Sequence, residues 1–279
     1  MMTRIALAGV MMSIGMTAAY AQNVALPPVI NPLPAKATLP DGLFELSGVT
    51  LGSSREEAAA ALTALGKGTA SWEKPNIPDP RYMGSGGINF RFKQPPLLQQ
   101  VIKGSDRSTD TYSVSMTSNV NETRAYRIDR RLNHATAAQQ ISVPDLVGAL
   151  TAKYGNPSWH DEAGRKLYWI WFEGKRVAAG AFDPSDKAFG KPGGCLYAGV
   201  YVPEIFYFDQ PGSFRNLVGC QTVIEVGYAA GQRPDLSARV NFLLLDVERF
   251  RRNVMETDAW ARAELQKIVD GKGGTAPKL

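Results

Sequence analysis

The chain has 279 residues, of which 44% are hydrophobic, 20% charged and 9% aromatic, and its formal net charge is +5. These values are typical of a globular protein and exclude a wholly disordered chain, a coiled coil and a collagen-like repeat. Two cysteines exclude a zinc-finger array or a disulfide-dense small scaffold, and two histidines leave little for a multi-histidine metal centre. At ~150 residues per domain, the length predicts about two domains.

The first 21 residues have the order of a secretory signal peptide. Residues 1–4 carry Arg4, residues 5–19 are uncharged and mostly apolar, and Ala19 and Ala21 supply the small residues of a cleavage site. The uncharged run is shorter than the ~20 residues that span a bilayer as a helix, although an uncleaved anchor is the alternative. We expect cleavage after Ala21, export to the periplasm or the medium, and a mature chain that crosses no membrane.

Export changes the expected state of the two cysteines. Cys195 and Cys220 are separated by 24 residues, and an oxidising compartment favours a disulfide between them. A redox or nucleophilic thiol is the alternative, and it needs a lowered pKa and a nearby base. The sequence shows no C-x-x-C motif and no histidine beside either cysteine, so we predict the disulfide.

The two ends of the mature chain differ from its middle. Residues 22–40 contain five prolines, which remove backbone donors and predict an extended leader that is not part of the core. Binding of this stretch in a partner's groove is the alternative to a plain spacer. Residues 271–279 are rich in glycine and polar residues and predict a disordered tail.

Residues 41–141 are predicted to form a first helix-sheet unit. Ser54 and Glu57 have the spacing of a capping box at the start of a helix. Apolar residues then fall on one helical face, at Ala58, Ala61, Leu62 and Leu65. Alternating apolar residues within 88–92, 112–116 and 126–132 follow, and their period of two predicts half-buried strands.

Residues 142–270 repeat this order as a second unit that starts 88 residues later. Ser142 precedes a helix with Pro144 in its first turn and an apolar stripe of Leu146, Leu150 and Tyr154. We predict strands at 166–173, 176–182, 196–202, 222–228 and 240–245, and a terminal helix or helix pair at about 247–269. The fold is therefore expected to be α+β, with antiparallel sheets and with helices on one face. The spacing permits either one continuous sheet or two packed domains.

The entry to each helix carries a resemblance to known exported proteins. Residues 48–57 read G-x-x-L-G-x-S-x-x-E, and residues 48–65 and 143–171 resemble the unit of the BamE/SmpA–OmlA lipoproteins and the tandem units of β-lactamase-inhibitor proteins. The resemblance implies non-catalytic protein binding in the envelope and implies no active-site residues. Two features depart from it: the chain has no lipobox cysteine, and residues 85–141 exceed the usual length of one unit.

Few residues are candidates for catalysis or metal binding. His160, Asp161 and Glu162 form a cluster that could supply a general base or part of a metal site. Neighbouring side chains on extended backbone point apart, so a polar loop is the simpler interpretation. His134 follows a strand pattern and is expected at a solvated strand end. No nucleophile elbow, Walker loop, H-E-x-x-H motif or calcium loop is present, so we assign no catalytic residue, metal or cofactor.

An arginine-rich strand is a candidate anion site. Arg124, Arg127, Arg130 and Arg131 crowd one strand-like run, and on a strand Arg127, Asp129 and Arg131 share one face. A half-solvated strand explains this pattern, and the alternative is that Arg127 and Arg131 bind an anionic glycan or a lipid headgroup. The modest net charge and the predicted export argue against a nucleic-acid partner.

Aromatic residues concentrate in residues 154–208, which hold 13 of the chain's 26. Residues 166–173 read KLYWIWFE and are apolar on both faces. Such a strand is either central in a covered sheet or exposes an aromatic binding face. The candidate binding surface comprises Trp159, Tyr168, Trp169, Trp171, Phe172, Phe206, Tyr207 and Phe208.

Together these features favour an exported, non-enzymatic protein of the cell envelope that binds another envelope protein as an adaptor, assembly factor or inhibitor. Two alternatives stay open. One is a periplasmic hydrolase that acts on a glycan or an ester through His134 or His160. The other is a carrier that holds a small hydrophobic or anionic ligand inside the second sheet.

Overall fold

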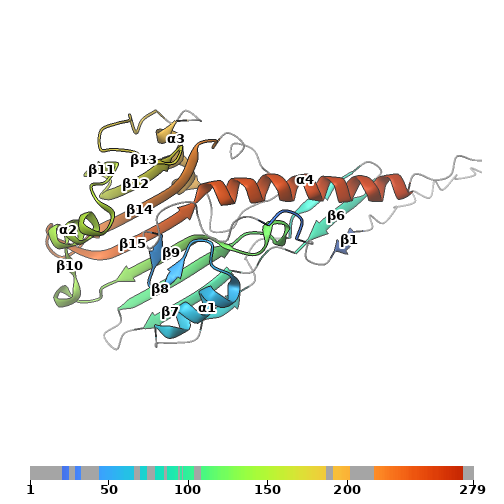
Figure 1. Ribbon diagram of the computed structural model, residues 1–279. Coiled ribbons are helices and arrows are strands. Elements are labelled where there is room, and N and C mark those ends of the chain that lie inside the picture. Colours follow the sequence, from blue (N-terminus) through green and yellow to red (C-terminus); the bar gives the residue numbers. More distant parts are fainter. Residues whose placement is uncertain are drawn as a thin grey trace, which may run out of the picture.

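The computed structural model describes residues 21–24, 29–32, 44–65, 70–73, 79–84, 87–93, 95, 97–103, 108–186, 191–201 and 217–272 (Figure 1). Residues 1–20 of the predicted signal peptide, most of the predicted leader and the tail from residue 273 lie outside these ranges. In the described ranges, none of the helices combines the length and the apolar character that a membrane span requires.

A ten-stranded sheet organises the described part of the chain. Its strand order is β11-β12-β14-β15-β9-β8-β7-β4, with β10 paired to β15 and β13 paired to β12. All of these pairs are antiparallel. The strands are β4 (Ser71–Glu73), β7 (Leu97–Lys103), β8 (Thr109–Met116), β9 (Ala125–Asn133), β10 (Ile141–Ser142), β11 (Trp159–Asp161), β12 (Lys166–Phe172), β13 (Lys175–Arg176), β14 (Cys220–Ala230) and β15 (Leu236–Asp246). The fold is α+β, as predicted.

The pairing of β9 with β15 joins the two predicted units. Seven residues of β15, from Arg239 to Leu245, lie opposite residues of β9, from Asn133 to Arg127. The alternative in which the two units share no sheet is therefore excluded for the described strands. The sequence pattern could not show this, because register between distant strands depends on side chains that meet only in the folded protein.

Helices cover both faces of this sheet, whereas one helical face was expected. The helices α1 (Arg55–Ala64) and α2 (Val143–Tyr154) pack on one face, and α3 (Pro192–Tyr201) and α4 (Val247–Lys272) contribute to the cluster on the other. Strand β12 separates the two clusters: Trp169 belongs to the first and Ile170 to the second. A two-sided apolar strand requires cover on both faces, because either face alone would leave aromatic area in water.

The two helices predicted at the start of each unit are confirmed. Ser54 caps α1 through a hydrogen bond from the backbone N–H of Glu57, and the Glu57 side chain accepts from the backbone N–H of Ser54. Ser142 caps α2 in the same way, by accepting from the backbone N–H of Asp145. Gly155 ends α2 with a φ of 76°, a value that favours glycine.

Two predicted strands are wrong. Residues 196–202 were expected as a strand, but α3 begins at Pro192 and continues to Tyr201. A short apolar run does not distinguish a strand from a helix, and proline suits the first turn of a helix. The strand predicted at 176–182 stops after β13, because a turn closes from Ala181 to Ala178 and Gly180 takes a φ of 71°.

Helix α4 extends from the ten-stranded sheet toward a second, three-stranded sheet (Figure 1). This sheet has the order β1 (Ala21–Val24), β6 (Asn89–Phe92) and β5 (Arg81–Met83). Trp260 of α4 packs edge-on against Phe90 and Phe92, with ring centroids 5.5 and 5.4 Å apart. A further hairpin, β2 (Glu45–Leu46) and β3 (Val49–Thr50), completes the described strands.

The start of the predicted leader is a strand. Residues 21–24 form β1, which pairs in parallel with β6, so this part of the leader is not a free spacer. The prolines of the leader begin at Pro27, after the end of β1. Every residue of β1 therefore keeps the backbone N–H that strand pairing uses.

A buried hydrogen-bond network fastens α4 to a short 3₁₀ turn, η2 (Asn119–Asn121), that precedes β9. The Asn253 side chain accepts from the backbone N–H of Ser118 and donates to the side chains of Ser118 and Asn121. Each polar group of this amide has a partner, which is the condition under which a buried amide stabilises a core.

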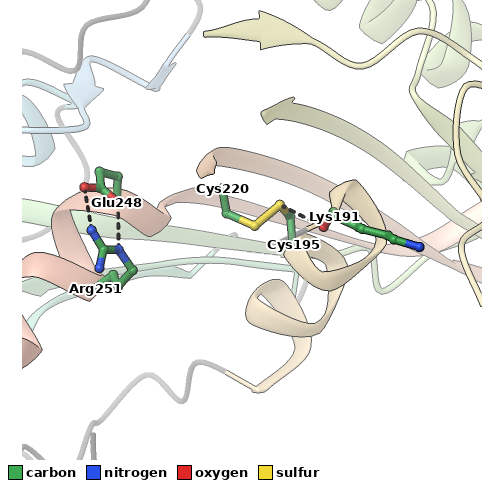
Figure 2. The surroundings of a disulfide bond; sticks show 5 residues. All are labelled: Lys191, Cys195, Cys220, Glu248 and Arg251. Atoms are coloured by element: carbon green, nitrogen blue, oxygen red, sulfur yellow. Dashed lines mark hydrogen bonds and ion pairs between the residues drawn. A yellow bond between two sulfur atoms is a disulfide. The ribbon is translucent and has the colours of Figure 1, made fainter. Parts of the chain in front are cut away.

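The predicted disulfide is confirmed. Cys195 on α3 is bonded to Cys220 at the start of β14, with the Cα atoms 5.5 Å apart (Figure 2). Both residues are almost fully buried in the cluster on the α4 side of the sheet.

Candidate functional site

The aromatic strand β12 is core and not an exposed surface. Tyr168, Trp169 and Trp171 are at most 4% exposed. The indole N–H of Trp169 donates to the carbonyl of Gly155 at 2.8 Å, which satisfies the polar atom of this buried ring. The interpretation of these three rings as a binding surface is therefore wrong, because a partner cannot reach them in this fold.

The other rings of that predicted surface divide into two groups. Trp159 stacks on Tyr168 at 5.2 Å with an angle of 12° between the ring planes, and it is partly buried against the α4-side cluster. Phe172 is partly buried against the same cluster. The remaining three, Phe206, Tyr207 and Phe208, lie outside the described residues.

The two candidate anion-binding arginines have different environments. Arg127 is buried, and its guanidinium donates to both carboxylate oxygens of Asp129 at 2.6 and 2.8 Å. Its charge is therefore paired with that of Asp129, and its role in binding an anion stays a prediction. Arg131 is exposed, and within the described residues its side chain has no ion pair or hydrogen bond.

Arg131 lies on a part of the sheet that no apolar cluster covers. The cluster on the α4 side includes no residue of β7 or β8 and only Tyr126 from β9, as far as the described residues go. On this side a cross-strand row runs from Val101 through Thr111 and Arg131 to Asn241. We call these four residues the open sheet face; Val101 is 49% exposed, and Arg131 and Asn241 are also exposed.

A shallow depression of about 150 Å³ lies within the open sheet face. Its described lining includes Thr111, Asp129, Arg131 and Asn241. Ser113 also lines it, and the buried Ser113 hydroxyl has no hydrogen-bond partner within the described residues. The exposed side chains of Arg131 and Asn241 offer hydrogen-bond donors and acceptors to another molecule.

The predicted cluster at residues 160–162 does not form a metal site. His160 and Asp161 lie on β11, which pairs with β12, and so they are on a strand and not in the expected loop. His160 Nε2 lies 3.4 Å from the hydroxyl of Tyr228. Throughout the described residues there is no group of three or more histidine, cysteine, aspartate or glutamate side chains that could hold a metal ion.

A larger hollow lies on the opposite face of β8 and β9. It has a volume of about 340 Å³ and opens beside the C-terminal end of α1. We call it the polar hollow. Its described lining comprises Ser47, Leu65, Ile102, Ser108, Thr109, Asp110, Tyr112, Arg130, Leu132, Asn133 and His134. This volume is at the small end of the range of ligand cavities, ~300–1,000 Å³.

An ion pair and a phenol form the floor of the polar hollow. Arg130 donates to both oxygens of Asp110, at 3.0 Å from Nε and 2.8 Å from Nη2. The hydroxyl of Tyr112 donates to Asp110 at 3.0 Å and lies 3.1 Å from the hydroxyl of Ser47. The guanidinium of Arg130 is 5.2 Å from the centre of the Tyr112 ring. These contacts fix the orientation of all three charged or aromatic groups.

The surroundings also fix the protonation of these groups. Burial raises the pKa of Tyr112 above its usual value, so the phenol stays a neutral donor at neutral pH. Burial alone would lower the pKa of Arg130, but its hydrogen bonds and ion pair with Asp110 outweigh that effect and raise it. Among its described lining residues, the hollow therefore contains one ion pair, between Arg130 and Asp110.

His134 lies at the edge of the polar hollow, where the sequence predicted a solvated strand end. Its backbone N–H donates to the carbonyl of Ala238, but its Nε2 atom is buried and has no partner among the described residues. A buried polar atom without a hydrogen bond costs about 1–3 kcal/mol. This unsatisfied atom was not foreseen, because sequence does not show which strand end is covered.

The sequence contained Tyr112 and Arg130 without showing that they meet. Tyr112 was an apolar position of a predicted strand, and Arg130 was one of several crowded arginines. The register between β8 and β9 places the two residues directly opposite each other. If the segments 109–116 and 125–133 had been treated as neighbouring strands, the proximity of Tyr112 and Arg130 could have been predicted, since cross-strand partners share a face.

Comparisons with known proteins were made for the whole chain. No protein-family model, curated protein or solved structure matches it.

Proposed function

We propose that this chain is an exported, non-enzymatic binding protein of the cell envelope that engages another envelope protein through the open sheet face. The observation that carries the proposal is the row of Val101, Thr111, Arg131 and Asn241 on paired strands of the ten-stranded sheet, which no apolar cluster of the described residues covers. The row combines an exposed apolar side chain, an unpaired cation and neutral polar groups, which is a mixture common in protein interfaces.

Export is supported by two independent features. Residues 1–21 have the pattern of a secretory signal peptide, with an uncharged segment followed by small residues at a cleavage site. Cys195 and Cys220 form a disulfide, and such bonds persist in oxidising compartments such as the periplasm.

Binding is favoured over catalysis by what the helix-entry motifs resemble. The motif at residues 48–57 is similar to that of envelope proteins whose role is to bind other proteins. Its capping geometry around Ser54 and Glu57 is present in the fold. Neither histidine, His134 or His160, is hydrogen-bonded to a carboxylate in the described residues, so the alternative of a hydrolase has less support.

The charge of the open sheet face indicates the chemistry of the partner. Asp129 is paired with Arg127, and Lys166 farther along the sheet is paired with Glu225 at 2.6 Å. Arg131 is left as an exposed cation, and arginine is enriched among the residues that contribute most to binding energy. We therefore expect an acidic surface on the partner, which the opposite charge attracts.

Site-specific photo-cross-linking in the native envelope tests the proposal. A photoreactive residue at position 131 or 241 is expected to give one dominant protein adduct. The same residue at position 175 serves as the control, because Lys175 is an exposed strand residue on β13, at the other end of the sheet. Equal adducts at all three positions, or none at 131 and 241, would refute the assignment of this face.

Charge reversal gives the matched energetic test. Arg131→Glu is expected to weaken binding of the captured partner by about tenfold or more. The substitution turns the attraction between Arg131 and an acidic partner surface into a repulsion. Lys175→Glu changes the net charge by the same amount and is expected to leave the affinity unchanged. If both variants weaken binding equally, only net charge matters and the open sheet face is not the binding surface.

A further inference from the structure

We propose that the polar hollow is a binding site for a neutral, polyhydroxylated small molecule, of the chemistry of a single sugar ring. The site is separate from the open sheet face, because it lies on the opposite side of β8 and β9. The inference does not depend on the proposed protein partner, and its test can fail or succeed independently.

Charge limits the class of ligand. Of the described residues that line the hollow, Asp110 is the one acidic side chain and Arg130 the one permanently basic side chain. The two are joined by paired hydrogen bonds at 2.8 and 3.0 Å. An anionic ligand would approach the Asp110 carboxylate, and a cationic ligand would approach Arg130. Among the described lining residues neither gains an unpaired counter-charge, so a neutral ligand is favoured.

Unused hydrogen-bonding capacity indicates a ligand with hydroxyl groups. Asp110 Oδ1 accepts a bond from Arg130 Nε, and a carboxylate oxygen can accept a second one. A hydroxyl group both donates and accepts, so a hydroxyl of the ligand can donate to Asp110 while the ring of His134, which also lines the hollow, lies beside the ligand.

The apolar part of the lining suits the carbon skeleton of such a ligand. Leu65, Ile102 and Leu132 contribute hydrocarbon to the same hollow. A sugar ring presents C–H groups between its hydroxyls, and these can contact aliphatic side chains while the hydroxyls bond elsewhere. Cavities that combine apolar walls with a few fixed polar groups are the usual form of small-molecule sites.

The polar groups are held in place before any ligand arrives. Tyr112 is almost fully buried and bonded to both Asp110 and Ser47, and Arg130 lies over its ring. Asn133 donates to Thr109 at 2.8 Å and accepts from Arg239 at 2.8 Å. Such preorganisation reduces the entropy that a ligand loses on binding.

Three sugars of equal size and different charge test the inference: glucose is neutral, glucuronate is anionic and glucosamine is cationic at neutral pH. Each is titrated into the isotopically labelled full-length mature protein, and chemical-shift changes of the His134 imidazole and the Ile102 methyl group are followed. Glucose is expected to shift both signals with a dissociation constant near or below about 1 mM, and the charged sugars to bind about tenfold more weakly.

Variants locate the site. His134→Ala is expected to weaken glucose binding about tenfold, because it removes a side chain that lines the hollow. His134→Gln provides a second variant that keeps a polar side chain in case the alanine variant does not fold. Arg131→Ala is the matched control: it alters a neighbouring residue of the same strand whose side chain points to the opposite face, and glucose binding is expected to be unchanged.

Each other outcome would overturn the inference. Preference for glucuronate would make the hollow an anion site, and preference for glucosamine would make it a cation site. Absence of shifts with all three sugars at about 10 mM would exclude a sugar-ring ligand of useful affinity. Glucose binding that Arg131→Ala weakens and His134→Ala leaves intact would place the sugar on the other face of the sheet.

Discussion

At the scale of single residues, Tyr168 shows how burial determines chemistry in this sheet. Its ring is 4% exposed and stacks on Trp159, and the neighbouring residue Lys166 is paired with Glu225 across the strands. Burial, and then the negative charge of Glu225, raise the pKa of Tyr168 to about 12. The phenol therefore remains neutral in the folded protein at pH values where an exposed tyrosine ionises.

This difference predicts a loss of stability in alkali. Below pH 10 the phenol is neutral in both folded and unfolded chains, and its contribution to stability is fully present. Between pH 10 and about 12 the unfolded chain releases the proton first, so the free energy of unfolding falls as pH rises. Two pH units correspond to roughly 2 to 3 kcal/mol.

Tyr168→Phe removes this ionisation, and its urea unfolding should be measured at several pH values from 9 to about 12, the alkaline range of tyrosine ionisation. The free energy of unfolding of the variant is expected to fall less steeply than that of the natural chain over this range. When tyrosine ionisation is followed by ultraviolet absorbance as the pH rises, the variant should also lack the titration step at the highest pH. Identical slopes in the two proteins would show that Tyr168 does not ionise late.

At the scale of elements, the disulfide decides how α3 is attached. Cys195 and Leu196 place this helix in the cluster on the α4 side, and Cys220 begins β14 at the centre of the sheet. The 24 residues between the cysteines form the loop that the bond closes. In the chain-entropy model, a loop of this length stabilises the folded state by roughly 3 kcal/mol.

The double variant Cys195→Ala and Cys220→Ala is therefore expected to lower the free energy of unfolding by about 3 kcal/mol. Alanine is chosen because serine would place an unpaired hydroxyl in the core. Denaturant unfolding measures the change. Reductant is the control: it should reproduce the loss in the natural chain and have no effect on the double variant. A variant as stable as the oxidised chain would contradict the estimate.

At the scale of the whole molecule, one sheet and a shared core unite the two predicted units. Strand β9 of the first unit pairs with β15 of the second through seven residue pairs. Phe44 of the first unit packs edge-on against Trp171 of the second, with ring centroids 4.9 Å apart. Neither unit can bury its central strands alone, because the pairing of β9 with β15 and the packing of Phe44 on Trp171 each need one residue set from each unit.

We therefore expect that fragments 22–141 and 142–279 do not fold separately. Each fragment alone should lack a cooperative unfolding transition when ellipticity is followed in urea, because it would expose β9 or β15 as an unpaired edge. The two fragments mixed together should recover ellipticity and a transition, and the intact chain should unfold in one step. A cooperative transition in either isolated fragment would show two independent domains.

The sequence predicted those elements that local chemistry defines. Ser54 and Ser142 precede helices because their side chains accept hydrogen bonds from the first turn, and this preference needs no distant contact. The strands at 166–173, 222–228 and 240–245 followed from composition and alternation. Residues 196–202 were predicted wrongly because a short apolar run fits a helix as well as a strand, and the residues around it decide the outcome.

Function-related residues were harder to predict than elements. The aromatic run was recognised, but whether Trp169 and Trp171 face a partner or the core depends on α2 and on Phe44, which are distant in sequence. Arg127 and Arg131 look equivalent in the chain. They differ in the fold because Arg127 is buried with Asp129, whereas Arg131 lies where no apolar cluster covers the sheet.

By itself the sequence determined the α+β class, the capped helices, most strands and the cysteine pairing, because these depend on local periodicity, on capping and on a count of two cysteines. Only the tertiary structure decided that the two units share one sheet, that helices cover both of its faces, and that Asp110, Tyr112, Arg130 and His134 line one hollow. The physical reason is that strand register and burial arise from contacts between residues far apart in the chain, which no local pattern specifies.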